Sequence, residues 1–194
     1  MRPGTRSNNR EAHLFNEAAR LFRRKGYDGT SIRDIVSRLE MTPSSFYYHY
    51  KSKEELLLAV YKRGIDEITQ AVEAAITRQS EPWTRLEAAC AAHLKALLES
   101  SDCPQVVVRI LPQDVPRAAK RMIALRDQYE RIFARLIGDL KLARGVRSHY
   151  LRLVLLAALN TTQNWFKKDG ESSPAQIAQQ IVQLLRSPAE AQGS

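Results

Sequence analysis

Apolar residues recur along this chain at intervals of three and four, the spacing that places them on one face of a helix. Read with start signals such as Ser, Thr and Pro and stop signals such as Gly, this pattern predicts helices along most of the chain. We expect them at about residues 9–25, 30–39, 43–48, 52–78, 82–100, 104–111, 116–142, 147–167 and 174–186. No window of alternating polar and β-branched residues bounded by turn residues is present, so a sheet is not expected. The sequence therefore predicts an all-α fold.

Two helix starts carry specific signals. Asn8, followed by Glu11 three residues on, is a start signal for the first helix, and Thr30 is a suitable N-cap for the second.

The first six residues and the tail 187–194 lie at the chain ends and are expected to be mobile. The helix at 147–167 is apolar on several faces, which predicts deep burial or a subunit interface.

Positive charge is concentrated in the N-terminal quarter of the chain. Of 194 residues with a net charge of +9, residues 1–53 contain 11 basic and 5 acidic side chains. Such a concentration favours a surface for a polyanion, with nucleic acid as the first candidate and an anionic membrane as the second. A solvated basic face is the plainer alternative.

The overall composition narrows the class of protein. With 44% hydrophobic and 26% charged residues, the chain is an ordinary globular protein. Two cysteines, Cys90 and Cys103, are too few for a disulfide framework, and the segment MRPGTRSNNR lacks the apolar core of a secretory signal. The longest apolar stretch, 153–159, is far shorter than the roughly 20 residues of a membrane span. We therefore expect a cytoplasmic protein with no membrane partner.

The predicted helices at 30–39 and 43–48 are joined by a tight connector, and together they form the helix-turn-helix pattern. In that pattern the second helix is the one that recognises the DNA bases. The segment 41–53, MTPSSFYYHYKSK, contains no acid. It supplies small polar groups for base edges, aromatic or imidazole donors for phosphates, and cations. These residues are Thr42, Ser44, Ser45, Tyr47, His49, Lys51 and Lys53. Helical spacing places Phe46 and Tyr50 on one face, so Tyr47 and Tyr48 cannot both be buried with them.

The segments TSIRDIV (30–36) and MTPSSFYYHYKSKEEL (41–56) resemble the DNA-binding motif of the TetR family of transcriptional regulators. The resemblance implies a homodimer on a palindromic double-stranded DNA operator. It also implies a helix-turn-helix DNA-binding domain at 1–53 and a helical ligand-binding and dimerisation domain at 54–194. The residues that it assigns to DNA binding are Arg33, Thr42, Pro43, Ser44, Ser45, Tyr47, Tyr48, His49 and Lys53.

The motif departs from the family pattern at four positions. Glu40 replaces the usual turn Gly, Leu39 and Val36 replace small Ala residues, and Ser44 stands where Gly is common. Glu40 requires a turn without glycine, which would alter the angle between the two helices of the motif.

Two segments of the second domain, LRDQYE (125–130) and LNTTQNWFKKDG (159–170), resemble a TetR subgroup whose members answer to acyl-CoA thioesters. Thr161 departs from that pattern, because an aromatic residue usually follows the Asn. The resemblance implies a small hydrophobic effector, with an acyl-CoA thioester as the candidate.

A pocket for such a thioester needs an apolar slot and cations for the phosphates. Basic residues gather around 109–126, and polar amides interrupt the apolar helix at 147–167. The candidate ligand-binding residues are Arg109, Arg121, Met122, Arg126, Tyr129, Phe133, Asn160, Gln163, Asn164 and Trp165. The alternative is that the cations are solvated and that the Met and aromatic residues belong to the core.

The sequence offers little for catalysis. Its four histidines are widely separated with no ligand partner at metal-binding spacing, and it contains no P-loop, no G-x-G-x-x-G and no G-x-S-x-G motif. We expect no metal, no cofactor, no catalytic residue and no enzymatic activity.

The favoured hypothesis is a ligand-released repressor that dimerises through the helices at 147–167 and 174–186, with Leu156 and Ile181 at central positions. A regulator of drug efflux that responds to uncharged or cationic hydrophobic compounds is the main alternative. An all-α enzyme and a nonspecific architectural DNA binder are two others.

Overall fold

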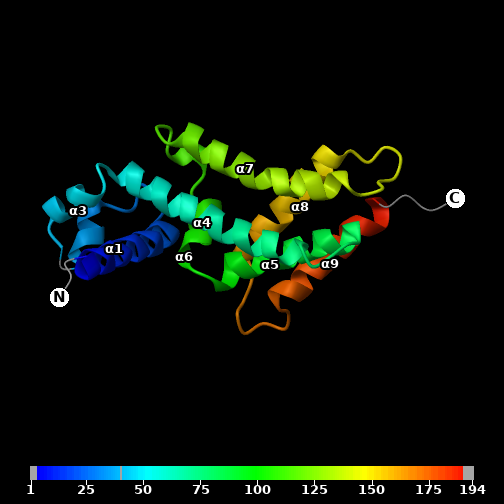
Figure 1. Ribbon diagram of the computed structural model, residues 1–194, viewed down its shortest axis with the longest axis horizontal. Helices are drawn as coiled ribbons and strands as arrows, with labels where there is room; N and C mark the ends of the chain where they lie inside the picture. The colour runs from blue at the N-terminus through cyan, green and yellow to red at the C-terminus, as the bar shows by residue number, and fades with distance from the viewer. Residues whose placement is uncertain (1–3, 40, 190–194) are drawn as a thin grey trace. The chain divides into compact units, whose positions relative to one another are not determined.

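The computed structural model describes residues 4–39 and 41–189, which are helical over most of their length and contain no strand (Figure 1). The all-α prediction is confirmed. The α-helices are α1 (Gly4–Lys25), α2 (Ile32–Ser37), α3 (Pro43–His49), α4 (Lys53–Ile76), α5 (Pro82–Glu99), α6 (Asp102–Arg109), α7 (Ala119–Gly138), α8 (Ser148–Thr161) and α9 (Pro174–Ala189). Two short 3-10 helices, η1 (Pro112–Asp114) and η2 (Thr162–Asn164), follow α6 and α8.

The predicted starts of the first two helices were wrong. α1 begins at Gly4, so Asn8 lies inside the helix and residues 4–6 are helical. α2 is capped by Ser31, whose side chain accepts the N–H of Asp34 in a capping box. Thr30 has a different role, because it is buried and its hydroxyl donates to the carbonyl of Gly26 over 2.8 Å. Position 40, where the turn Gly of the family is replaced, lies outside the described residues.

The chain forms two compact units. The N-terminal unit contains the chain up to Ile65 together with Ser101–Leu125, and the C-terminal unit contains Asp66–Ser100 together with the chain from Arg126. α4 and α7 each begin in the first unit and end in the second. The domain boundary after residue 53 stays a prediction, because compactness does not define which part binds DNA.

In the N-terminal unit α1 packs against α2 and α6. Arg23 of α1 joins α6 twice, through an ion pair with Asp102 at 2.9 Å and a hydrogen bond to Gln105 at 3.2 Å. α4 crosses α6 at Gly64, where any side chain would collide with the backbone of Cys103. The apolar core of this unit includes Leu14, Ala18, Phe22, Ile35, Phe46, Leu57, Val60 and Val106.

In the C-terminal unit α5 packs along α9, and α8 contacts both. α8 was expected to reach residue 167 but ends at Thr161, where the hydroxyls of Thr161 and Thr162 both donate to the carbonyl of Ala158. Such bonds from side chain to backbone compete with the continuing ladder. Gln163 and Asn164 therefore lie in η2, outside the helix to which the sequence assigned them.

Candidate DNA-binding surface and effector site

The predicted reading helix is present as α3, and its first residues determine where it starts. Thr42 is the N-cap, and its hydroxyl oxygen accepts the backbone N–H of Ser45. Pro43 occupies the first helical position, where its missing N–H breaks no hydrogen bond. The hydroxyls of Thr42 and Ser45 lie 3.1 Å apart, so both are presented at the same end of α3.

α3 buries one side chain and exposes its aromatic neighbours. Phe46 is fully buried, whereas Tyr47 is 54% exposed and Tyr48 is 83% exposed. Tyr48 contacts His49 edge-to-face, with ring centroids 5.1 Å apart. The expectation that Tyr47 and Tyr48 are not both buried with Phe46 is confirmed. The other residues assigned to base or phosphate contact that are exposed are Arg33, Thr42, Pro43, Ser44 and Ser45.

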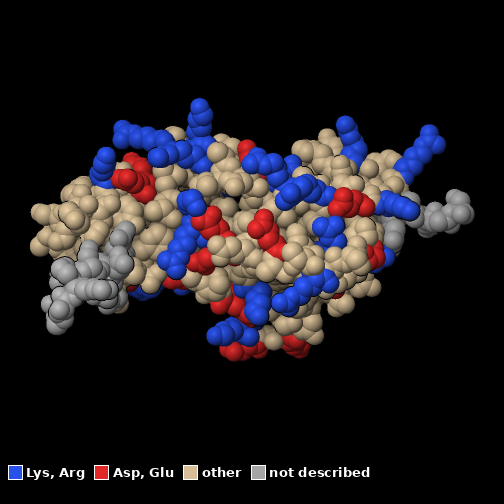
Figure 2. Space-filling model, in the orientation of Figure 1, with Lys and Arg blue, Asp and Glu red and all other residues tan. Residues whose placement is uncertain are grey.

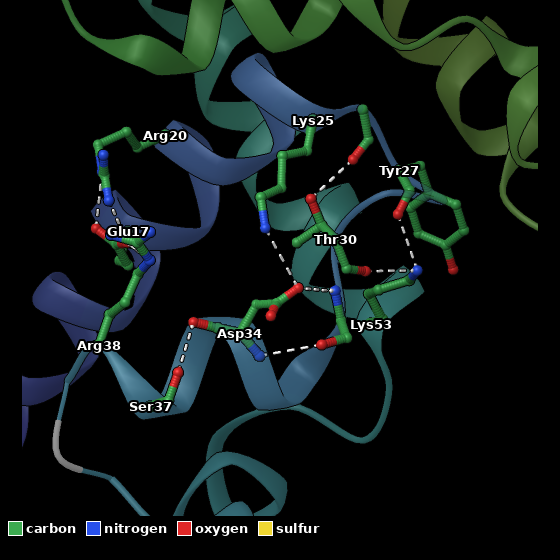
Figure 3. A network of polar contacts seen from close by, with 11 residues as sticks. Glu17, Arg20, Lys25, Tyr27, Thr30, Asp34, Ser37, Arg38 and Lys53 are labelled. Carbon is green, nitrogen blue, oxygen red and sulfur yellow. Dashed lines mark hydrogen bonds and ion pairs between the residues drawn. The ribbon is translucent and has the colours of Figure 1, made fainter.

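Lys53, at the start of α4, is held by the turn between α1 and α2 (Figure 3). Its ammonium donates to the carbonyls of Tyr27 at 2.9 Å and Thr30 at 2.8 Å, and lies 3.9 Å from the centre of the Tyr27 ring. Burial, with a smaller contribution from Glu54, raises the pKa of Tyr27 to about 12. The lysine that the sequence assigned to phosphate binding is thus also a structural tie between α4 and the turn before α2.

Two carboxylates hold α1 and α2 together in the same view (Figure 3). Glu17 of α1 pairs with Arg20 at 2.7 Å and with Arg38 at 3.3 Å, and the hydrogen bond from Arg20 holds the pKa of Glu17 below its usual value. Asp34 lies 3.7 Å from the ammonium of Lys25. The hydrogen bonds from Ser31 are the largest cause of a lowered pKa at Asp34.

The lysines, arginines and acidic residues of the helix-turn-helix motif lie on the elements next to α3 and not on α3 itself. Figure 2 shows acidic and basic side chains interspersed over much of the visible face, while the surface over α3 is uncharged. This agrees with the sequence of α3, PSSFYYH, which contains neither an acid nor a lysine or arginine. An uncharged reading helix flanked by cations suits a groove in which bases are read between phosphates.

The candidate effector residues fall in both units. Arg109, Arg121 and Met122 belong to the N-terminal unit, where Met122 is fully buried and both arginines are exposed. The remaining candidates belong to the C-terminal unit: Arg126, Tyr129, Phe133, Asn160, Gln163, Asn164 and Trp165.

A buried aromatic cluster in the C-terminal unit brings Tyr129 and Phe133 of α7 against His93 of α5. The Tyr129 hydroxyl lies 2.6 Å from Nδ1 of His93, and Phe133 makes edge-to-face contacts with both rings. Burial lowers the pKa of His93 to about 4, an effect that its contact with Asn160 opposes. His93 was missed in the sequence, because a lone histidine on an apolar helix face gives no signal of its partners.

Two other predicted ligand residues, Trp165 and Arg126, are not part of this aromatic cluster. Trp165 is 56% exposed and makes no ring contact with this cluster. Arg126 lies 4.0 Å from Glu130, which also binds Arg152 at 2.7 Å. Arg152 is therefore a second cation beside Glu130, and it was not identified as a candidate from the sequence.

The described residues contain no group of three or more metal-ligating side chains and no helix that is long and apolar enough to cross a membrane.

Comparison with known proteins places this arrangement in a family. Residues 79–188, more than half of the chain, match the tetracyclin repressor-like C-terminal domain, and residues 14–60 match the tetR family of bacterial regulatory proteins. The chain therefore belongs to the TetR family, which confirms the resemblance seen in its helix-turn-helix segment.

Three similar proteins illustrate the range of the family. The HTH-type transcriptional repressor KstR2 of Mycobacterium tuberculosis is 24% identical over 189 residues, 92% of each chain. The Tn10 TetC protein of Escherichia coli is 30% identical over 102 residues, which are 51% of this chain and only 50% of TetC. The crystal structure of AibR with isovaleryl coenzyme A and operator DNA has a TM-score of 0.80 at 24% identity, covering 93% of this chain and 99% of AibR.

These matches decide the class of function. The family and the relatives are transcriptional regulators, so this chain is a TetR-type DNA-binding transcriptional regulator and not an enzyme.

Proposed function

We propose that this chain is a homodimeric repressor that binds a palindromic double-stranded DNA operator and leaves it when an acyl-CoA thioester binds. The observation that carries the DNA-binding part is α3 itself, an acid-free helix that exposes two hydroxyl residues at its start and two tyrosines beyond them. Exposed aromatic side chains of this size, next to cations, suit phosphate and base contacts. Because operator DNA lies in the cytoplasm, we place the protein there.

The roles within the DNA-binding surface follow from reach and charge. Short hydroxyls at the start of α3, above all Ser45, contact base edges. His49, Lys53 and Tyr47 contact phosphates, which carry no sequence information. The full set of proposed contact residues is Arg33, Thr42, Pro43, Ser44, Ser45, Tyr47, Tyr48, His49 and Lys53.

The proposed dimer interface is formed by α8 and α9. α8 buries Leu155 and Leu156 within its own chain but leaves Val154 54% exposed, and Leu184 of α9 is 72% exposed. An apolar hollow of about 470 Å³ next to Val154 includes Leu185 of α9 in its lining. An isologous interface places the same apolar patch of each subunit against the other, which would cover these side chains.

The proposed effector site lies around the aromatic cluster of α7. Tyr129 and Phe133 offer an apolar wall, and Arg126 and Arg152 offer cations that suit the phosphates of coenzyme A. The similarity to AibR, whose solved complex contains isovaleryl coenzyme A and operator DNA, supports this ligand class. The operator is released because the ligand binds more tightly to a conformation of the dimer that does not fit the operator.

The DNA-binding proposal is tested by selecting genomic fragments with the protein and footprinting them. We expect protection of two inverted half-sites about 34–36 Å apart, one helical turn, or a multiple of that spacing. Ser45→Ala should weaken operator binding by about 1–3 kcal/mol and leave random DNA unaffected. Equal affinity for operator and random DNA in the unmodified protein would instead support an architectural DNA binder.

The effector proposal is tested by thermal shift with a panel of acyl-CoA esters, free acids and hydrophobic drugs. A ligand at 100 times its dissociation constant should raise the free energy of unfolding by about 2.7 kcal/mol. We expect that only acyl-CoA esters produce this shift. A shift with uncharged or cationic drugs alone would replace the proposal with that of a drug-responsive regulator.

A further inference from the structure

Tyr48 occupies the centre of the exposed face of α3. Phe46 is fully buried, and Tyr50 contacts it with ring centroids 6.2 Å apart, so these two side chains define the face that packs on the core. Successive residues of a helix are rotated by about 100°, which places Tyr48 about 180° from the middle of that face. Its side chain is accordingly 83% exposed, the largest fraction among the large hydrophobic residues that the structure describes.

The neighbours of Tyr48 in the sequence lie on the two flanks of α3. The same rotation places Tyr47 and His49 about 80° to either side of the buried face, one on each flank. Tyr47 leans on Phe46, with ring centroids 5.3 Å apart. When such a helix lies in the major groove, its flanks face the phosphates and its outward face meets the base edges. The other exposed residues of this outward face are Ser44 and Ser45.

α3 lacks the side chains that read three of the four bases. Guanine is recognised mainly by Arg or Lys, adenine by Asn or Gln, and cytosine by Asp or Glu, whereas serine hydroxyls pair with more than one base. None of these six residue types occurs in PSSFYYH, residues 43–49. Arg33 belongs to α2, the helix of the motif that crosses the DNA backbone, and Lys51 and Lys53 lie beyond the end of α3. The base that remains is thymine, whose C5-methyl group is an apolar feature of the major groove.

We propose that Tyr48 is a specificity-determining residue whose ring packs against the methyl group of one thymine in each operator half-site. This inference rests on the proposed binding of a palindromic operator and adds the chemistry by which one of its bases is read. Contact between the ring and the methyl group removes apolar surface of both partners from water, which is favourable. His49 meets the Tyr48 ring edge-to-face at 5.1 Å and supports it from the flank.

The test replaces the thymines of the selected operator with uracil, one position at a time and in both half-sites together. Uracil pairs as thymine does and lacks only the C5-methyl group. For the unmodified protein we expect one position at which the double replacement weakens binding about 15-fold, because burying one carbon group is worth about fourfold in each half-site. At that position 5-methylcytosine should bind more tightly than cytosine, since it restores the methyl group alone.

Variants of the two exposed tyrosines assign the effect to one ring. Tyr48→Ser should bind the thymine and uracil operators equally, and Tyr48→Phe, which keeps the ring, should retain the difference. Tyr47→Ser is the matched control, because loss of a phosphate contact weakens binding to both operators and leaves their ratio unchanged. Tyr48 is exposed, so its replacement leaves the core intact and the unfolding midpoint should not change.

The outcomes of this experiment are distinguishable. If the unmodified protein selects no operator, the proposed operator binding and this inference are both wrong. Specific binding with equal affinity for thymine and uracil at every position would overturn the methyl contact alone. A preference for thymine that persists in Tyr48→Ser would show that another group reads the methyl and would overturn the assignment of Tyr48. Loss of the preference in Tyr48→Ser, with its retention in Tyr48→Phe and Tyr47→Ser, is the result that we expect.

Discussion

The ammonium of Lys53 lies 2.8 Å from the carbonyl oxygen of Thr30, so the first residue of α4 is bound to the turn that precedes α2. Lys53→Met removes this bond and the one to Tyr27. Because hydrogen bonds to charged groups contribute about 1.5–3 kcal/mol, the free energy of unfolding should fall by that order. Binding should weaken on operator and random DNA alike, with a salt dependence reduced by about one phosphate contact.

Lys51→Met is the matched control for Lys53, since Lys51 is exposed and two residues away. It should leave the unfolding midpoint unchanged. A loss in Lys53→Met that is confined to the operator would show that Lys53 reads sequence and would contradict the phosphate role.

The crossing of α4 over α6 at Gly64 has no room for a side chain. A Cβ at Gly64 would lie 2.7 Å from the carbonyl carbon of Cys103 and 2.8 Å from the Val107 side chain. Gly64→Ala should therefore destabilise the protein by about 1–3 kcal/mol through overpacking. Gly138→Ala is the control, because a Cβ there meets nothing within 4 Å and helical Ala is favoured over Gly. Equal unfolding midpoints for the two variants would show that α6 can move away from α4 without a loss of stability.

Val154→Glu tests the proposed dimer interface on an exposed residue of α8. A buried charge at the centre of an apolar contact is unfavourable, so the variant should remain folded and become monomeric in light scattering. Leu156 is unsuitable for this purpose, because it is buried in its own chain and a charge there would disrupt the core. A folded Val154→Glu protein that stays dimeric would place the interface elsewhere.

The buried imidazole of His93 predicts a pH dependence of stability. Its pKa is lowered to about 4 in the folded chain against 6.5 for an ordinary histidine. Between these values the unfolded state binds more protons, so the free energy of unfolding should fall as the pH drops from about 6.5 to about 4. The loss should amount to about 3 kcal/mol, at about 1.4 kcal/mol per pKa unit. We expect the free energies of unfolding of the unmodified protein and of His93→Gln, measured by denaturant titration, to converge as the pH falls. If the two free energies change in parallel with pH, His93 is not the group that titrates.

The sequence predicted those features that depend on near neighbours. Thr42 and Pro43 determine the start of α3, and the spacing of Phe46 places it in the core, as the structure shows. The prediction that Thr30 caps α2 was wrong, because the adjacent Ser31 also carries a hydroxyl and forms the cap while Thr30 is buried against the turn.

Features that depend on distant partners could not be predicted. Lys53 meets a carbonyl 26 residues away, and His93 meets a hydroxyl 36 residues away. Neither separation leaves a pattern in a single sequence, because only the packing of α5 against α7, or of α4 against the α1–α2 turn, brings the groups together. The contact residues assigned to DNA and effector stay predictions.

The most direct test of the whole account is the fluorescence anisotropy of labelled operator DNA bound to the protein, titrated with an acyl-CoA ester, with free coenzyme A and with the matching free acid. We expect saturable release of the operator by the ester, with little response to coenzyme A or to the acid. Release by the free acid, or an operator complex that no CoA ester dissociates, would contradict it.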